Sequence, residues 1–248
     1  MKRIICGFAV ALVIASIFAP KTAADDPASA MIKQDGYTVT LDLKFMKKKP
    51  NAFQRFVSFL DYGPNGHATG FLVGDGLVMT AYHVVSGELS ISKKAQLGFA
   101  ANDELAVKAY VNGCEASVLK IDENADLALL RICQSRKHKA PAIQQTLSEN
   151  EKLLLIAKPF GDKMVRHGVF SGPYMFKGVQ YWSAKLDVRD GYSGSPVYND
   201  NAELVGVFTG YDWSKKLALI SPGERAKKLI EDYNSPPPPP MPPAPPQP

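Results

Sequence analysis

The sequence predicts an all-β protein, a barrel or a sandwich rather than alternating β-α-β units. Short apolar runs recur along the chain, and Gly, Asn, Asp and Pro residues separate them. Short strands at this close spacing are typical of antiparallel sheets. The runs lie at 71–73, 77–79, 116–119, 127–132, 153–157, 197–198, 204–208 and 217–220. A length of 248 residues and a hydrophobic content of 46% allow one large core or two small ones.

The N-terminus has the pattern of a secretory signal peptide. Lys2 and Arg3 precede an apolar run over 4–19, and small residues follow at 22–24. A retained membrane anchor is the alternative, but the run is short for a spanning helix. We therefore expect a cleaved signal peptide over 1–24, no membrane span in the mature protein, and a periplasmic or secreted location.

The segments that flank the predicted strands have their own character. Residues 25–49 are polar and basic and form a predicted N-terminal extension, with one strand near 37–43. The Ser-Pro-Gly-Glu sequence at 221–224 supplies an N-cap serine, a proline at the first helical position and a glutamate three residues after the cap, which predicts a C-terminal helix. Residues 234–248 are almost pure proline. They predict a disordered polyproline II tail, either a spacer or a ligand for a partner protein.

Charge and side-chain spacing exclude several classes of function. The net charge is +5, and the signal peptide would remove three basic residues, so the mature chain is close to neutral. We therefore expect no nucleic-acid partner. No His-Glu-x-x-His motif and no clustered Cys/His spacing occurs, which predicts neither a metal nor a cofactor.

Two cysteines remain after the signal peptide, Cys114 and Cys133. The runs 115–121 and 127–132 are predicted strands on either side of a turn. A hairpin centred between residues 123 and 124 places the two cysteines opposite each other, close enough for a disulfide. An oxidising compartment favours the bridge, and two free buried thiols are the alternative.

A turn rich in glycine, at 191–196, holds the candidate nucleophile Ser193. Glycines allow backbone N–H groups to converge on one small space, as a developing oxyanion requires. An ordinary hairpin is the alternative for this turn alone. A serine hydroxyl also needs an adjacent base and a third group that orients the base. His83 directly follows an apolar strand, and Asp126 opens another; these two are the candidates.

The other histidines and the nearest other acid are weaker candidates. They are His67 in a glycine-rich turn, His138 in a basic loop, His167 beside an arginine, and Asp122 on the far side of its turn.

These motifs together resemble the chymotrypsin-fold, trypsin-like serine proteases, most closely the bacterial HtrA/DegP type. The resemblance covers residues 60–233 and rests on TGFLV at 69–73, MTAYHVV at 79–85, ADLALL at 125–130, KPFG at 158–161, GVFSG at 168–172 and GYSGSPV at 191–197. It implies two packed six-stranded antiparallel β-barrels, the first over 50–140 and the second, with the C-terminal helix, over 141–233.

The resemblance also implies roles for particular residues. His83, Asp126 and Ser193 would form the catalytic triad, and the N–H groups of Gly191 and Ser193 would form the oxyanion hole. The substrate would lie as an added strand beside Phe208, Thr209 and Gly210.

Some residues depart from the family pattern. Ser195 replaces a usual glycine, and Tyr192 replaces the aspartate that captures a new N-terminus in digestive proteases, so no such zymogen switch is expected. The proline tail follows where the HtrA type often carries PDZ domains, so PDZ-dependent regulation is not expected. Asp187 lies where trypsin-like enzymes bind Lys or Arg, but its basic neighbours at 185 and 189 leave a paired surface charge as the alternative.

The sequence as a whole predicts a serine endopeptidase that cleaves proteins or peptides through an acyl-enzyme. A catalytically silent binding module on the same fold is the alternative. A lipase or esterase is disfavoured, because the glycine spacing around Ser193 is wrong for that class and no histidine follows it.

Overall fold

The computed structural model describes residues 36–50, 65–133, 140–144 and 146–235. The predicted signal peptide, the proline tail, and parts of the predicted extension and first barrel lie outside these residues. Within them, no helix is both long enough and apolar enough to cross a membrane.

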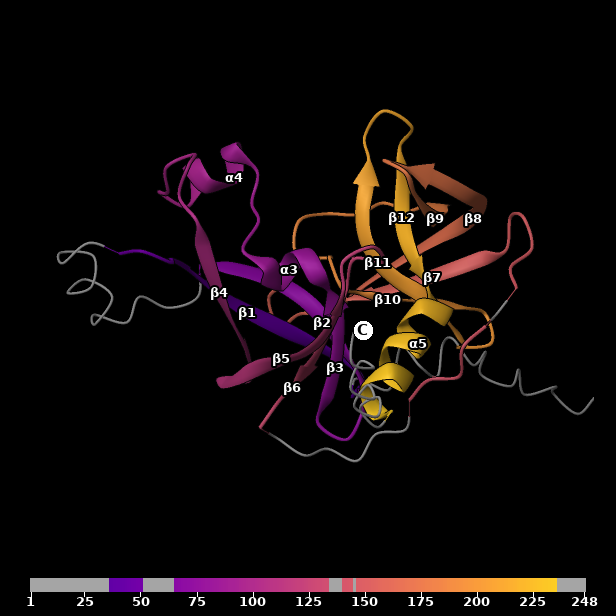
Figure 1. Cartoon of the computed structure of the whole chain (residues 1–248). Helices are drawn as coiled ribbons and strands as arrows, with labels where there is room; N and C mark the ends of the chain where they lie inside the picture. The colour runs from indigo at the N-terminus through magenta and orange to yellow at the C-terminus, as the bar shows by residue number, and fades with distance from the viewer. Residues whose placement is uncertain (1–35, 51–64, 134–139, 145, 236–248) are drawn as a thin grey trace, which may run out of the picture.

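Two closed six-stranded antiparallel barrels pack side by side, which confirms the predicted fold (Figure 1). The strand order is β1-β2-β3-β6-β5-β4 in the first barrel and β10-β11-β12-β9-β8-β7 in the second. The first barrel contains β1 (Thr38–Lys47), β2 (Gly66–Gly74), β3 (Leu77–Ala81), β4 (Leu105–Val111), β5 (Cys114–Asp122) and β6 (Leu127–Arg131). The second contains β7 (Lys152–Ala157), β8 (Met164–Phe176), β9 (Val179–Lys185), β10 (Pro196–Asn199), β11 (Leu204–Asp212) and β12 (Leu217–Pro222).

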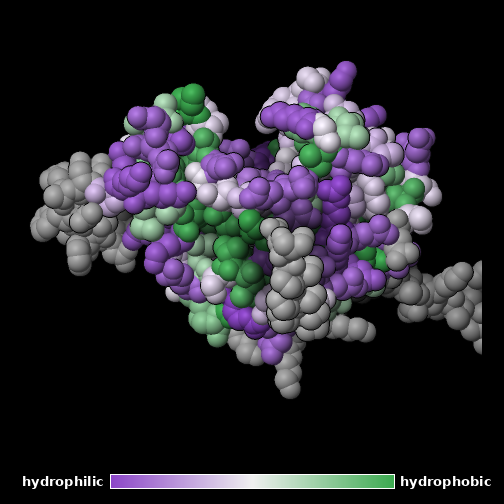
Figure 2. All heavy atoms as spheres, in the orientation of Figure 1, coloured by the Kyte–Doolittle hydropathy of each residue, from purple (hydrophilic) through white to green (hydrophobic). Residues whose placement is uncertain are grey.

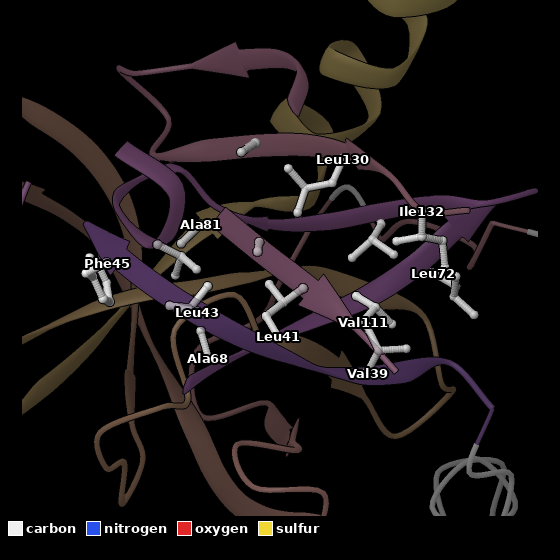
Figure 3. Close-up of a cluster of buried hydrophobic side chains, with 14 of the residues drawn as sticks. Val39, Leu41, Leu43, Phe45, Ala68, Leu72, Ala81, Val111, Leu130 and Ile132 are labelled. Atoms are coloured by element: carbon white, nitrogen blue, oxygen red, sulfur yellow. The ribbon is translucent and has the colours of Figure 1, made fainter. Parts of the chain in front are cut away.

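The first barrel begins inside the segment predicted as an N-terminal extension. Strand β1 alternates buried apolar residues with more exposed polar ones, and Leu41, Leu43 and Phe45 point into the barrel (Figure 3). This period of two is that of a strand with one face in the core. The barrel therefore starts before the predicted boundary at residue 50. The lysines in and after β1 make this segment polar and basic in composition, which is why it was predicted to be an extension.

The helix α5 (Gly223–Asn234) spans the two barrels. Its Leu229 belongs to a buried cluster that takes Phe71 from the first barrel and Tyr198 from the second. Its C-terminal end also bonds the first barrel, since the Asp232 carbonyl accepts from Lys120 Nζ at 2.8 Å. The helix thus fixes one barrel relative to the other.

The start of α5 differs from the prediction. Ser221 was expected as the N-cap, but it lies in β12, where it pairs with Val207 of β11. Its buried hydroxyl has no hydrogen-bond partner among the described residues. Pro222 takes the N-cap position instead. The capping prediction is wrong because the sheet extends through the residues that resemble a cap.

A disulfide joins Cys114 and Cys133, with 6.0 Å between their Cα atoms, so the bridged alternative is correct. The predicted hairpin register is wrong. Asp122 lies opposite Leu127 rather than residue 125, so the turn is centred one residue later than predicted. A bulge between Val118 and Lys120 then leaves Ser117 opposite Arg131 rather than residue 130.

Candidate active site

A cleft of about 630 Å³ lies between the barrels. Two short helices follow β3 beside it: α3 (Tyr82–Ser86) and α4 (Ile91–Gln96). Figure 2 shows a hollow between two lobes, and in the same view Figure 1 places α4 on one lobe and the tip of the β11–β12 hairpin on the other. His67, His83, Gly191, Ser193, Phe208 and Gly210 are among the residues that line the cleft.

The first barrel places His83 against Asp126. The pairing of Ala81 with Leu127 brings the end of β3 beside the start of β6. Asp126 Oδ1 accepts from the His83 backbone N–H at 2.8 Å, and Asp126 Oδ2 lies 2.7 Å from His83 Nδ1. A carboxylate at Nδ1 holds the ring proton there, which leaves Nε2 free to accept a proton.

The backbone of Asp126 is fixed as firmly as its side chain. Its φ is +53°, its N–H donates to the Glu123 carbonyl at 3.2 Å, and its carbonyl accepts from the Tyr82 N–H at 3.1 Å. The competing acid, Asp122, instead accepts from the Ala125 N–H at 3.0 Å and so braces the same turn. Asp126 is therefore the acid that faces the imidazole.

The glycine-rich turn presents two unengaged N–H groups. The N–H groups of Tyr192, Gly194 and Ser195 donate to backbone carbonyls at 2.8 to 3.2 Å. Those of Gly191 and Ser193 donate to no group within the part of the chain that the structure describes. Two free donors two residues apart, at the mouth of a cleft, can bind an anionic oxygen.

Ser193 lines the same cleft as His83 but does not bond it. Its hydroxyl forms no side-chain hydrogen bond to any described residue. In the predicted triad, hydrogen bonds thus join Asp126 to His83, but none joins His83 to Ser193. Hydrogen bonds of this kind often tighten only when substrate binds.

Thr69 connects the nucleophile turn to the first barrel. Its N–H donates to the Ser193 carbonyl at 3.0 Å, and its Oγ1 donates to the Gly191 carbonyl at 2.9 Å. Thr80 Oγ1 in turn donates to the Thr69 carbonyl at 2.8 Å. Thr69 and Thr80 could not be assigned these roles from the sequence, since hydrogen bonds to backbone carbonyls leave no motif.

His67, which lines the cleft, belongs to a second histidine–carboxylate pair. His67 Nδ1 lies 3.1 Å from Asp42 Oδ1, and the His67 ring packs edge-on against Phe160 at 4.8 Å. His67 was predicted to lie in a turn, but it lies in β2, opposite Asp42 of β1. The sequence signal for this pair was one polar residue, Asp42 or His67, in each of two strands that are neighbours along the chain.

The predicted substrate-binding residues separate into two groups. Phe208 and Gly210 line the cleft. Thr209 is buried, with its hydroxyl 3.5 Å from the Leu219 carbonyl, and is not among the lining residues. Asp187 is also absent from the lining; its exposed carboxylate lies 3.9 Å from Arg166 Nε, which is the paired-charge alternative.

The described residues include no cluster of three or more His, Cys, Asp or Glu side chains that could hold a metal ion. At the cleft the structure brings together a hydroxyl, an imidazole with its carboxylate partner, and two backbone donors.

Comparisons with curated proteins agree with this geometry. The magnetosome formation protease MamE of Paramagnetospirillum magneticum is 27% identical over 201 residues, which are 74% of this chain and 26% of MamE. Serine protease HTRA4 of Mus musculus is 23% identical over 69% of this chain and 35% of that protein. A probable periplasmic serine endoprotease, DegP-like, of Ectopseudomonas mendocina is 25% identical over 74% of this chain and 40% of that protein. The chain thus spans well under half the length of these relatives.

A solved structure has the same fold. The inactive form of a serine-to-alanine mutant of Rv3671c, from M. tuberculosis H37Rv, superposes with a TM-score of 0.55 at 14% identity. The match covers 87% of this chain and 94% of the other. A family model described as a trypsin-like peptidase domain matches residues 68–207, which run from β2 of the first barrel to β11 of the second and contain His83, Asp126 and Ser193. The chain belongs to the trypsin-like peptidase domain family.

Proposed function

We propose that this protein is a serine endopeptidase that acts outside the cytoplasm, in the periplasm or as a secreted protein. The observation that carries the proposal is the pair of hydrogen bonds that Asp126 accepts from His83, beside a cleft that also exposes Ser193 and the two unengaged N–H groups.

Each group has a defined role in the proposed reaction. Ser193 Oγ attacks the carbonyl carbon of a peptide bond while His83 Nε2 takes the hydroxyl proton. Asp126 stabilises the imidazolium that forms, and the N–H groups of Gly191 and Ser193 bind the oxyanion. His83 then protonates the leaving amine, which leaves an acyl-enzyme at Ser193. Water hydrolyses this ester with His83 again as the base.

Substrates of this reaction are proteins or peptides in extended form. Strand β10 pairs with β11 as far as Val207, and the nucleophile turn bonds both backbone groups of Phe208. The edge of β11 beyond Phe208, beside Gly210, is available for an added strand. Backbone pairing of this kind binds many sequences, and pockets beside the strand provide selectivity.

Three observations support an extracytoplasmic location. The N-terminus resembles a signal peptide, the domain contains the Cys114–Cys133 disulfide, and one relative is named as a probable periplasmic endoprotease. N-terminal sequencing of the mature protein from separated cell fractions tests this part; a mature protein in the cytoplasm would contradict it.

A fluorophosphonate probe tests the chemistry. The Ser193 oxygen displaces fluoride from phosphorus and forms a stable ester only where the serine is activated. Wild type should be labelled and Ser193→Ala should not, with circular dichroism to show that both are folded. Among the bases, His83→Ala should abolish labelling, whereas His67→Ala should retain most of it. Labelling that depends on His67 instead would reassign the base.

The open contact between Ser193 and His83 favours a second candidate, a catalytically silent binding module. The same experiment separates the two functions. A folded wild-type protein that the probe does not label, and that cleaves no peptide from an unbiased library, would be a binding module.

A further inference from the structure

Trp213 leaves a large apolar surface uncovered beside the cleft. Its side chain is 79% exposed, and it lies between β11 and β12 at the tip of their hairpin. Its ring packs edge-on against Tyr211, with 4.7 Å between centroids, and both residues line the cleft. Rigid aromatic side chains of this kind are the residues that most often anchor a bound peptide.

The turn that carries Trp213 is fixed before any ligand arrives. Asp212 Oδ1 accepts from Ser214 N–H at 2.9 Å, from Ser214 Oγ at 2.7 Å and from Lys215 N–H at 3.3 Å. Asp212 Oδ2 accepts from the Tyr174 hydroxyl at 2.6 Å. Since the turn is already ordered on both sides of the indole, a ligand would lose little affinity in ordering it.

An unpaired strand edge leads from the nucleophile to this indole. Gly194 N–H donates to the Phe208 carbonyl at 2.8 Å, which ties the nucleophile turn to β11. The Phe208 N–H in turn donates to the Ser195 carbonyl at 2.8 Å. Beyond Phe208, β12 covers one edge of β11, and no described strand pairs with the other edge. Trp213 lies five positions after Phe208, about 16 Å at the rise of a strand. A peptide paired with this edge reaches the indole about four or five residues from the bond that Ser193 attacks.

Leu89 and Leu97, which flank α4, line the cleft on the side of the first barrel, together with Glu88 and Lys93. Lys93 Nζ lies 3.4 Å from Asp190 Oδ2, so this lysine already has a charged partner. The two leucines, with Tyr211 and Trp213 of the second barrel, offer apolar contacts to a large uncharged side chain.

We propose that Trp213 is a substrate-binding residue that selects extended polypeptides with a large apolar side chain, aromatic or aliphatic, about four or five residues from the scissile bond. The selected residue lies on the side of that bond which pairs with β11. This specificity rests on the proposed endopeptidase function.

Cleavage of an unbiased peptide library, with the cut sites read by mass spectrometry, tests the proposal. Wild type should show Trp, Phe, Leu and Met enriched at one position four or five residues from the cut. In Trp213→Ala, kcat/KM for an apolar peptide relative to its alanine counterpart should fall about tenfold. Trp213→Phe should retain most of the preference. Met175→Ala removes another exposed apolar side chain, 62% exposed and outside the cleft lining, and should leave the preference unchanged.

A binding arm separates this specificity from the catalytic proposal. A displayed random peptide library is selected on folded Ser193→Ala protein, with and without Trp213→Ala. Enrichment of apolar residues that requires Trp213 supports the proposed binding role of Trp213, even if the fluorophosphonate probe does not label wild type. Absence of labelling would overturn only the proposed endopeptidase function. No apolar enrichment, or enrichment that survives Trp213→Ala, would overturn the Trp213 proposal. A preference that emerges only after removal of residues 236–248 would identify the tail as the occupant and would also overturn it.

Discussion

Thr69 Oγ1, in the first barrel, donates a hydrogen bond of 2.9 Å to the carbonyl of Gly191, in the second barrel and 122 residues away. Thr69 is fully buried, and its Oγ1 also accepts from the Lys158 N–H at 3.1 Å. Its own N–H holds the Ser193 carbonyl. The backbone and side chain of Thr69 therefore link the packing of the two barrels to the position of the proposed nucleophile and oxyanion hole.

Replacement of Thr69 by valine should slow the proposed chemistry more than it unfolds the protein. The variant keeps the volume but leaves the Gly191 carbonyl without a donor, so the turn can shift. A displacement of about 1 Å near a reacting group can cost about 100-fold in rate. We expect the fluorophosphonate labelling rate to fall about 10- to 100-fold, and the free energy of unfolding to fall by about 1–3 kcal/mol.

Thr40→Val is the matched control. Thr40 Oγ1 also bridges the barrels, since it donates to the Lys158 carbonyl at 2.7 Å and accepts from the Gly161 N–H at 3.1 Å, but it does not contact the nucleophile turn. It should lose similar stability with a much smaller loss of labelling rate. Equal losses of labelling in both variants would show that Thr69 acts through stability alone.

Gly194 should tolerate no side chain. Its φ is +84°, and a Cβ there would lie 2.1 Å from both the Thr69 carbonyl oxygen and Thr80 Oγ1. Gly178→Ala is the control, because φ at Gly178 is +82° but the space around it is open. The control should cost about 1–2 kcal/mol for backbone strain, and Gly194→Ala should cost clearly more in denaturant unfolding and abolish labelling. Equal unfolding costs would mean that the barrels separate easily at this contact.

Asp126→Asn should abolish most catalysis while the fold is kept. An asparagine oxygen can still accept from the His83 backbone N–H, but its amide favours the wrong tautomer of the imidazole. The corresponding change in a serine protease triad lowers kcat about 10⁴-fold, and a loss of that order is expected in peptide hydrolysis. Asp42→Asn makes the same change at the second pair, with His67, and should cost far less. A larger loss from Asp42→Asn would assign the base to His67.

The features that the sequence could predict are those with a local signature. Short apolar runs between turn residues predict the strands, and the surroundings of His83, Asp126 and Ser193 predict a base, an acid and a nucleophile. Tertiary hydrogen bonds have no such signature. Thr69 was therefore missed, since any buried threonine could hold a carbonyl.

Local patterns leave the outcome open where a tertiary arrangement decides. Asp187 has the spacing of a specificity residue, but its carboxylate lies 3.9 Å from Arg166 Nε and it is not among the residues that line the cleft. The Ser-Pro-Gly-Glu sequence has the form of a helix cap, but sheet pairing takes Ser221 first. Trp213 was not singled out, because exposure of a single tryptophan cannot be read from its neighbours in the chain.

Removal of the disulfide should destabilise the first barrel without changing the chemistry. Cys114 and Cys133 are 19 residues apart, and closure of a loop of this size stabilises a protein by about 3 kcal/mol. The Cys114→Ser, Cys133→Ser double variant should therefore unfold at a lower temperature, and dithiothreitol should shift wild type toward it while leaving the variant unchanged. A wild-type transition that reductant does not move would contradict a stabilising role for the bridge.

Tyr174→Phe should change stability in a pH-dependent way. The hydrogen bond from the Tyr174 hydroxyl and, to a smaller extent, that from Ser214 lower the pKa of Asp212 from its ordinary value of 3.8 to about 2. A lowered pKa means that ionised Asp212 stabilises the fold above pH 4, and that this contribution is lost as the pH falls from about 4 to about 2. The melting temperature of wild type should thus exceed that of Tyr174→Phe by a constant amount above pH 4, and the two should converge near pH 2.

Tyr110→Phe is the control. It removes a hydroxyl that has no hydrogen-bond partner among the described residues, so the difference in melting temperature between this variant and wild type should not vary over this pH range. A gap between Tyr174→Phe and wild type that stays constant down to pH 2 would mean that Asp212 is not held ionised by Tyr174. The fixed turn beneath Trp213 would then need another cause.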